Sequence, residues 1–129
     1  FYCPYGNRGV CTEDNGDFWI PARGSSLVST GLKTEIPEGY MLEIKNKSGI
    51  ASKRQLVVGA CVVDPGYDGE IYVNLHNIGV ETQKIKPGDK IAQAVLVPVV
   101  HCGIEETTED NLNNGSTRGE GGFGSTGDR

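Results

Sequence analysis

The segment 62–71 combines a carboxylate and an aromatic ring in one Pro/Gly turn, and these two groups could do chemistry together. Asp64 begins the turn and Tyr67 lies within it, and the β-branched residues on both sides predict a hairpin over 57–77. On a rigid hairpin, Asp64 could act as a general base and Tyr67 could form a flat wall for a sugar. An Asp-Pro-Gly turn is more often a solvated turn in which the aspartate caps the backbone. Both interpretations stay open on this pattern alone.

The glycine-rich segment 118–127 carries one arginine, one phenylalanine and two hydroxyl side chains. Glycine-dense backbone can approach phosphates closely and present several N–H donors. Arg118 could donate two hydrogen bonds to phosphate oxygens, and Phe123 could stack on a base. Ser125 and Thr126 could donate hydroxyl hydrogen bonds. Composition alone favours a disordered C-terminus, and the segment is not a Walker A loop because no Gly-Lys-Ser/Thr follows its glycines.

Two further short segments are candidates for ligand binding. In the segment 46–51, Ser48 and the neighbouring backbone amides could hold phosphate oxygens, although a serine cap on a short helix explains the pattern equally well. In the segment 88–93, Asp89 is interpreted as a turn former, and Gln93 is an isolated polar residue in an apolar strand. Neither segment by itself identifies a function.

The cysteines and histidines do not form a recognisable metal or catalytic set. The four cysteines show no C-x-x-C spacing and have no nearby pair of histidines, which argues against a zinc site. Cys3 and Cys11 could form a disulfide, but free thiols in a reducing compartment are the favoured interpretation, and this indicates the cytoplasm. We interpret His76 and His101 as structural.

The elements that must position these groups are predicted to be β-strands. Pro/Gly turns at 36–39, 64–69 and 86–89 separate short segments rich in β-branched residues. A spacing of about 8–12 residues between turns is typical of an all-β sandwich or barrel. No stretch keeps a helical period for three turns, and only 48–54 is expected to form a helical turn. The predicted strands are 18–20, 26–33, 40–46, 56–63, 70–77, 81–85 and 90–100.

Composition limits the size and the partners of the chain. The 129 residues suit one folded domain, which we expect to span 1–104, followed by a linker and tail over 105–129. The formal net charge of −5 opposes non-specific binding to nucleic acid. The longest apolar run, 91–100, is too short to cross a membrane, and no secretion signal is visible. Trp19 and Tyr40 are expected to pack in the core or in an interface.

Taken together and in this order, the four candidate segments resemble motifs two to five of the trimeric dUTPase family. The second motif corresponds to Lys-Ser-Gly-Ile-Ala at 47–51, and the third corresponds to the segment 59–71. The fourth corresponds to Gly-Asp-Lys-Ile-Ala-Gln at 88–93, and the fifth to Arg-Gly-Glu-Gly-Gly-Phe-Gly-Ser-Thr-Gly at 118–127. Any one match could arise by chance, but four at the spacing of the family, spanning 47–127, are strong evidence for the resemblance.

The first motif of the family and two single positions differ from the usual pattern. Phe1 and Tyr2 resemble the two residues that follow the aspartate of the first motif, so we expect the sequence as given to lack that aspartate and the first strand. The missing aspartate normally helps to hold the hydrated metal. Lys47 stands where the family usually has arginine, and Asp68 replaces the usual arginine after the tyrosine. Because neither change removes the proposed base, we expect activity with altered phosphate affinity.

The resemblance implies a jelly-roll-like β-barrel of the dUTPase-like β-clip type with a flexible glycine-rich C-terminal tail. It implies a homotrimer with shared active sites, in which one subunit supplies the third-motif hairpin, a second the other phosphate-binding motifs and a third the tail. The implied reaction is hydrolysis of dUTP to dUMP and pyrophosphate with Mg²⁺ as cofactor, which limits uracil in DNA and supplies dUMP for dTMP synthesis. The implied location is the cytoplasm, or the host-cell cytoplasm for a viral protein.

The resemblance also implies a role for each candidate residue. Asp64 would orient and deprotonate the water that attacks the α-phosphorus in line. Tyr67 would pack under the deoxyribose, and Phe123 would stack on uracil. Mg²⁺ would be held by the substrate phosphates and water, with no direct protein ligand and with Gln93 near its water shell. The other implied substrate-binding residues are Cys61, Val62 and Val63 at the uracil edge, Ser48 with Lys47 and Gly49 at the phosphates, and Arg118, Ser125 and Thr126 with Gly124 at the γ-phosphate.

Two other functions remain open on the sequence. A dCTP deaminase or a bifunctional deaminase–diphosphatase of the same fold is the first, and such relatives generally lack the full glycine-rich tail. A dUTPase-fold regulatory or interaction protein is the second. The intact Asp64, Tyr67 and Phe123 argue against a loss of catalysis, but they leave room for a second role.

Overall fold

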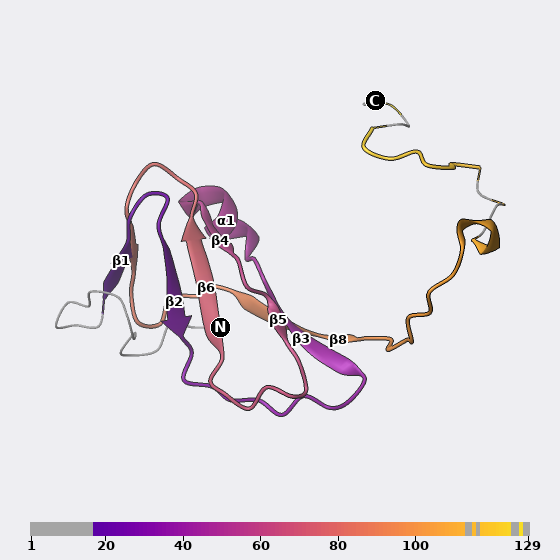
Figure 1. The fold of residues 1–129 in the computed structure, drawn as a ribbon. Coiled ribbons are helices and arrows are strands. Elements are labelled where there is room, and N and C mark those ends of the chain that lie inside the picture. The colour runs from indigo at the N-terminus through magenta and orange to yellow at the C-terminus, as the bar shows by residue number, and fades with distance from the viewer. Residues whose placement is uncertain (1–16, 113–114, 116, 125–126, 128–129) are drawn as a thin grey trace.

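The computed structural model describes residues 17–112, 115, 117–124 and 127. Within these ranges, eight β-strands and one short α-helix form the body of the molecule, and one turn of 3-10 helix lies in the tail (Figure 1). The all-β prediction is confirmed. The predictions on Phe1, Tyr2, Cys3, Cys11, Ser125 and Thr126 concern positions outside the described residues.

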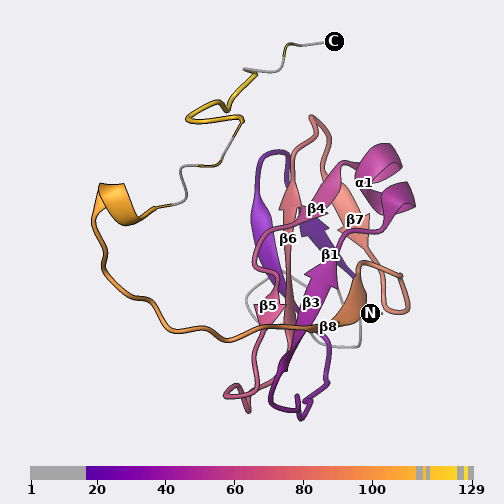
Figure 2. The same ribbon diagram turned by 90° about the vertical axis from the view of Figure 1, so that its right-hand side faces the viewer.

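The strands pair antiparallel into three small sheets, with the orders β1-β7, β2-β6-β4 and β5-β3-β8 (Figures 1 and 2). The strands are β1 (Phe18–Ile20), β2 (Ser25–Ser29), β3 (Tyr40–Lys45), β4 (Leu56–Val58), β5 (Val62–Val63), β6 (Tyr72–Asn77), β7 (Gln83–Ile85) and β8 (Gln93–Pro98). The helix α1 (Ser48–Arg54) lies between β3 and β4, and the 3-10 helix η1 (Glu109–Asn111) follows β8.

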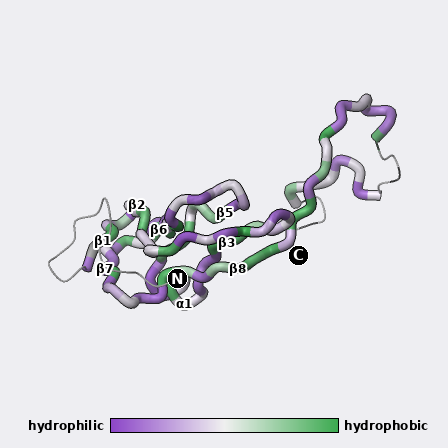
Figure 3. Tube along the Cα trace, turned by 90° about the horizontal axis from the view of Figure 1, so that it is seen from below, coloured by the Kyte–Doolittle hydropathy of each residue, from purple (hydrophilic) through white to green (hydrophobic). Residues whose placement is uncertain are grey.

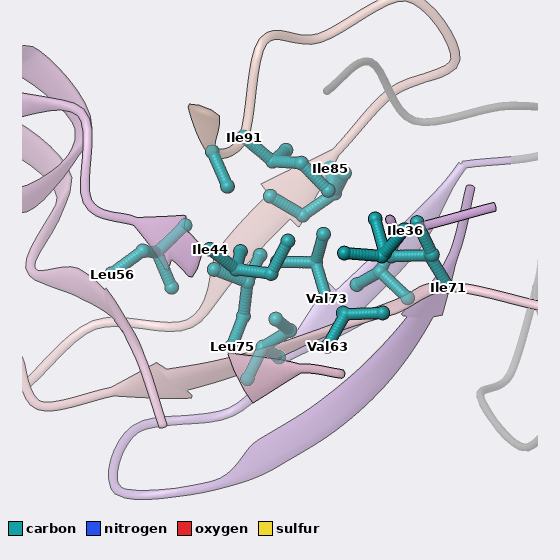
Figure 4. Close-up of a cluster of buried hydrophobic side chains, with 12 residues drawn as sticks. Ile36, Ile44, Leu56, Val63, Ile71, Val73, Leu75, Ile85 and Ile91 are labelled. Carbon is teal, nitrogen blue, oxygen red and sulfur yellow. The ribbon is translucent and has the colours of Figure 1, made fainter. Parts of the chain in front are cut away.

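One hydrophobic core joins the three sheets. In β6, Val73, Leu75 and Asn77 are buried while the residues between them are half-buried, which is the period of two expected for a strand with one face inward. Figure 4 shows buried side chains of different strands pointing toward one another. Because these side chains come from all three sheets, the core fixes the segments that carry the site. The core residues are Ile20, Val28, Ile36, Ile44, Leu56, Val63, Ile71, Val73, Leu75, Ile85, Ile91 and Ala92.

The single strand predicted over 56–63 is wrong, because the chain forms two strands that belong to different sheets. β4 pairs with β6, whereas β5 pairs with β3. Gly59 lies at the crossover, where an added Cβ would come within 2.2 Å of His76 Nε2 and 2.4 Å of Asn74 Oδ1. Glycine therefore allows the backbone to pass this close to β6 before it changes sheet. The predicted hairpin is a wide one, in which β5 carries Asp64 away from β6.

The other predicted strands form, but most are shorter than expected. The strand predicted over 26–33 ends at Ser29, shortly before Gly31 takes a left-handed φ of 70°. The strand predicted over 90–100 is confined to Gln93–Pro98. A hydrophobic pattern continues past the last ladder hydrogen bond, so it overestimates strand length. The helical turn predicted over 48–54 is confirmed as α1.

Two aromatic residues and one strand present apolar surface to solvent. Trp19 and Tyr40 are each 40% exposed, so the prediction that they pack in the core is wrong and only the interface alternative remains. β8 is apolar yet exposed along most of its length, with Val95 at 43% and Leu96 at 50% exposure (Figure 3). After β8 the chain leaves the sheets (Figures 1 and 2). Within the described ranges, no helix has the length and apolar character needed to cross a membrane.

Candidate active site

The turn after β5 holds Asp64 in a defined position. The backbone N–H of Gly66 donates to Asp64 Oδ1 at 3.1 Å, and the N–H of Tyr67 donates to the Asp64 carbonyl at 3.2 Å. The structure thus confirms the backbone-capping role that an Asp-Pro-Gly turn predicts. The side chain is also exposed to solvent. A capped but accessible carboxylate has the fixed position and the access to water that a general base needs.

Tyr67 is fixed at the far side of the same turn. Its hydroxyl donates a hydrogen bond to the backbone carbonyl of Glu70. Its ring lies against Gly69, where an added Cβ would come within 2.7 Å of the Tyr67 hydroxyl oxygen. Glycine at 69 therefore makes room for the ring, which is still 44% exposed. The exposed part can contact a ligand without any rearrangement of the turn.

Glu70 ties the end of this turn to the end of β2. Its Oε1 accepts hydrogen bonds from the Ser29 hydroxyl and from the backbone N–H of Gly31, the latter at 2.7 Å. Next to it, the carbonyl of Ile71 accepts from the hydroxyl of Thr30 at 2.7 Å. These side-chain bonds are charge-assisted or buried, which makes them strong anchors. The turn that carries the carboxylate and the tyrosine is therefore rigid at its base.

An apolar cavity of about 220 Å³ opens beside this turn. It is smaller than the range of about 300–1,000 Å³ typical of pockets that enclose a whole drug-sized ligand. Its size and apolar lining suit a planar ring with part of an attached sugar. Four of the predicted binding residues line it, namely Cys61, Val62, Val63 and Tyr67. The remaining lining residues are Leu27, Ile44, Ala60, Glu70, Ile71 and Tyr72.

The backbone of Val62 is directed toward an open edge. β5 is an edge strand, because its sheet has the order β5-β3-β8. The carbonyl of Cys61 accepts from the N–H of Ile44 on β3 at 2.7 Å. Since successive residues of an antiparallel strand direct their backbone groups to opposite sides, the N–H and C=O of Val62 point away from β3. These groups are suited to pair with a hydrogen-bonding ring edge.

The second candidate segment forms the start of α1. Lys47 occupies the N-cap position with an extended backbone and makes no side-chain cap hydrogen bond, and Ala51 N–H donates to its carbonyl at 2.9 Å. The alternative in which Ser48 caps a short helix is therefore wrong, because Ser48 is the first helical residue. Its side chain is exposed, as is Gly49. The Ser48 hydroxyl is thus not committed to capping the helix.

Gln93 and Asp89 connect the fourth candidate segment to the second. The side-chain amide of Gln93 donates to the carbonyl of Asn46, directly before α1, at 2.8 Å. Asp89 Oδ2 accepts from the Lys86 N–H at 3.0 Å, which confirms its predicted role as a turn former. The same oxygen lies 3.6 Å from Arg54 Nη1, at the end of α1. Two segments about forty residues apart in sequence are therefore neighbours in space.

A positive charge lies close to the residues that line the cavity. Lys45 Nζ is 2.8 Å from Glu43 Oε1 on the same strand. The hydrogen bond to the Glu43 carboxylate, supported by its charge, raises the pKa of Lys45 above its usual value, and Cys61 adds a smaller effect in the same direction. Lys45 therefore remains a cation throughout the neutral pH range. Across the described ranges, no three His, Cys, Asp or Glu side chains gather into a group that could hold a metal ion.

The sequence as a whole matches one known family. The family model described as dUTPase matches residues 14–127, which include every segment described above. The chain belongs to the dUTPase family. The deoxyuridine 5'-triphosphate nucleotidohydrolase of Gloeothece citriformis is 45% identical over 127 residues, which cover 92% of this chain and 86% of the relative. The enzyme of the same name from Candida albicans is 44% identical over 108 residues, covering 84% of this chain and 67% of the relative.

Solved dUTPase structures share the fold. A mutant dUTPase of Staphylococcus bacteriophage 80alpha with dUpNHpp matches with a TM-score of 0.79 at 25% identity, covering 86% of this chain and 80% of that one. A mutant dUTPase of phage phi11 of S. aureus, whose structure reveals the coordination of a structural Mg(II) ion, matches with a TM-score of 0.68 at 24% identity, covering 74% and 80%. The predicted dUTPase-like β-barrel is thereby confirmed.

The dUTPase motifs make two sets of hydrogen bonds within one chain. Gln93 of the fourth motif donates to Asn46, the residue directly before the second motif. Asp64 and Tyr67 of the third motif make their hydrogen bonds within their own turn and to Glu70. The fold thus fixes the internal geometry of each set.

The described part of the fifth motif makes local contacts. Arg118 Nε donates a hydrogen bond to the carbonyl of Gly121, and Phe123 is fully exposed with a φ of 49°. Gly124 has a φ of 94°, which suits glycine. Figure 1 shows this segment extending away from the sheets. An exposed arginine and phenylalanine on such a segment can reach a site on a neighbouring molecule.

Sequence reasoning missed three residues that hold the site. Glu70 anchors the turn that carries Asp64 and Tyr67, and Asn46 and Asn74 bind backbone N–H groups next to the cavity. Glu70 follows Gly69 in the third motif, so its place in that motif was an available signal. The two asparagines carry no local signal, because their partners lie 12 and 14 positions away in the chain.

Proposed function

We propose that this chain is a dUTP diphosphatase in which Asp64 activates the water that converts dUTP to dUMP and pyrophosphate. The observation that carries the proposal is the apolar cavity beside the capped, exposed Asp64 turn in a member of the dUTPase family. Relatives that cover most of the chain are named for hydrolysis of deoxyuridine triphosphate. A bound dUpNHpp in a structural neighbour supports a nucleotide as the ligand of this fold.

The cavity suits the uracil base and the deoxyribose. Backbone groups of Cys61, Val62 and Val63 would read the uracil edge, and the outward direction of the Val62 backbone supports this role. The Tyr67 ring would lie under the deoxyribose and leave no space for a 2′-hydroxyl. Its fixed position, held by Glu70 and Gly69, supports steric discrimination of this kind.

Asp64 would take one proton from the attacking water as the water oxygen bonds to the α-phosphorus. The bond from that phosphorus to the oxygen bridging to the β-phosphate breaks, and pyrophosphate leaves. Phosphoryl transfer of this kind depends on positioning and on charge neutralisation more than on covalent catalysis. The hydrogen bond from Gly66 orients the carboxylate, which supports the positioning part of this role.

The phosphates would be held by the second and fourth motifs and by the tail. Ser48, Lys47 and Gly49 offer a hydroxyl, a cation and exposed backbone. Gln93 directs its amide nitrogen to Asn46, so its amide oxygen can accept hydrogen bonds from metal-bound water. Bound Mg²⁺ would offset substrate charge that a chain with a net charge of −5 does not offset by itself. The γ-phosphate contacts would come from the hydroxyls of the tail and from its arginine.

A homotrimer with shared sites would bring together motifs that belong to different subunits. The exposed apolar residues of β8, Val95 and Leu96, offer surface for such an assembly. The extended tail, with its exposed Phe123, would close over the site of another subunit, stack on uracil and exclude water. We propose the cytoplasm as the place of action, or the host-cell cytoplasm if the protein is viral.

Pyrophosphate release from each deoxynucleoside triphosphate, with Mg²⁺ and with a chelator, tests the proposed function. We expect turnover of dUTP alone, and loss of turnover with the chelator. Ammonia release from dCTP would instead establish the deaminase alternative. A wild-type protein as inactive as Asp64→Asn, but still able to bind nucleotide, would establish a regulatory or interaction role.

A further inference from the structure

Three consecutive backbone N–H groups at the crossover from β4 to β5 are bound by only two asparagines. Val58 N–H donates to Asn46 Oδ1 at 2.7 Å. Gly59 N–H donates to the backbone carbonyl of Asn74 at 2.9 Å, and Ala60 N–H donates to Asn74 Oδ1 at 3.1 Å. Each asparagine therefore offers an oxygen where the chain leaves one sheet for the other and regular ladder pairing ends.

Close packing fixes the position of the crossover further. His76 Nε2 lies 3.0 Å from Asn74 Oδ1, so the imidazole holds the amide that binds Ala60. Gly59 passes directly over these two side chains, with no space for a Cβ. Asn74 and His76 are half-buried and lie on the same face of β6, because they are two residues apart. The crossover thus rests on the outer face of β6.

The crossover leads directly into the wall of the cavity. Ala60 and Cys61 line the cavity, and Val62 follows with its backbone directed to the open edge. Asn46 also accepts the Gln93 amide on its backbone carbonyl. The same residue therefore holds the end of β4, two residues before the cavity wall begins at Ala60, through its side chain, and the fourth motif through its backbone.

We propose that Asn46 and Asn74 are positioning residues that set the base specificity of this site by fixing the crossover 58–60. The inference rests on the proposed function, because it takes the cavity as the uracil site. Uracil and cytosine present opposite donor and acceptor groups at neighbouring ring positions. A wall that reads them through backbone groups discriminates only while those groups stay within about half an ångström of their positions.

Substitutions at Asn74 separate the hydrogen bond from the shape of the side chain. Asn74→Leu keeps the branching of the side chain at Cγ but removes the oxygen that accepts from Ala60, whereas Asn74→Asp keeps that oxygen. For Asn74→Leu we expect the KM for dUTP to rise about tenfold, with kcat within about threefold of wild type, since one neutral hydrogen bond is involved. The preference for dUTP over dCTP should fall by a similar factor. Asn74→Asp should remain within about threefold of wild type in both values.

Asn46→Leu and Asn46→Asp form a second matched pair. Asn46→Leu removes the acceptor for Val58 and should raise the KM for dUTP, and Asn46→Asp, which keeps an acceptor oxygen, should raise it less. The backbone carbonyl that binds Gln93 is present in both variants. A fall in kcat with an unchanged KM for Asn46→Leu would contradict a role in base positioning.

Amide hydrogen exchange reports the crossover directly, because loss of an acceptor exposes the N–H that it bound. We expect the Ala60 amide to exchange at least tenfold faster in Asn74→Leu than in wild type, and to stay protected in Asn74→Asp.

Calorimetric titration of the same variants with dUMP measures base binding without turnover. An inactive wild-type enzyme would overturn the proposed function, while dUMP affinity and exchange would still decide the role of the asparagines. Fast Ala60 exchange with wild-type affinity for dUMP, or unchanged exchange in Asn74→Leu, would overturn the inference.

Discussion

Gln93 and Asn46 are 47 positions apart in the chain, and the Gln93 side-chain amide donates to the Asn46 carbonyl at 2.8 Å. The bond orients the amide so that its nitrogen faces the start of α1. Its oxygen then faces away and can accept a hydrogen bond from water. A contact between the fourth motif and the residue directly before the second motif therefore also sets which atom of Gln93 faces the proposed phosphate site.

Gln93→Glu should lower kcat/KM for dUTP about 10- to 100-fold at saturating Mg²⁺, because it removes the donor to Asn46 and adds a negative charge beside the phosphates. Steady-state pyrophosphate release measures this effect. Gln83→Glu is the matched control, since Gln83 acts only as an acceptor for Arg54 Nε at 3.0 Å in the hydrogen bond seen here. We expect that control within about twofold of wild type. Equal losses in the two variants would show a general charge effect in place of the proposed contact.

Asp64→Asn should lower kcat about 10²- to 10⁴-fold, because an amide does not accept the proton of the attacking water. The amide side chain of this variant would keep an oxygen for the Gly66 N–H, so the turn and the thermal stability should be retained. Asp64→Ala removes the same proton acceptor and also removes the cap, which should lower the melting temperature as well. Differential scanning calorimetry beside the kinetic assay separates the two effects. Activity of Asp64→Asn near the wild-type level would remove Asp64 from the mechanism.

Glu70→Ala should lower the free energy of unfolding by about 1–3 kcal/mol, because it leaves the Ser29 hydroxyl and the Gly31 N–H without the acceptor that binds them. Glu70→Gln keeps an oxygen at this position and should lose less stability. Urea denaturation at one fixed protein concentration measures both, which matters because stability of an oligomer depends on concentration. Equal losses in Glu70→Ala and Glu70→Gln would show that the charge of Glu70, and not its acceptor geometry, stabilises the turn.

Deletion of residues 117–129 should abolish dUTP turnover and leave the proposed trimer intact. The β-strands and the core end before this segment, and Phe123 is exposed, so its removal leaves the body of the molecule unchanged. The kinetic assay measures the loss, and light scattering measures the mass of the assembly. Phe123→Ala should weaken dUTP binding through lost stacking, by about 5- to 100-fold. Monomers after the deletion would show that the tail contributes to assembly.

The local sequence determined the elements whose interactions are local. The Asp-Pro-Gly turn, the alternation of β6 and the turn-forming role of Asp89 were all predictable, because each depends on residues within a few positions. The motif set also predicted the family and four of the cavity-lining residues, Cys61, Val62, Val63 and Tyr67.

The tertiary structure decided how distant segments meet. The division of the predicted strand 56–63 between two sheets follows from the tight packing of Gly59 on β6, and no run of β-branched residues signals such a contact. The same holds for Gln93 on Asn46 and for Glu70 on Ser29, which are 47 and 41 positions apart. Hydrogen bonds over such separations form only after the core has brought the strands together, so the one-dimensional pattern does not contain them.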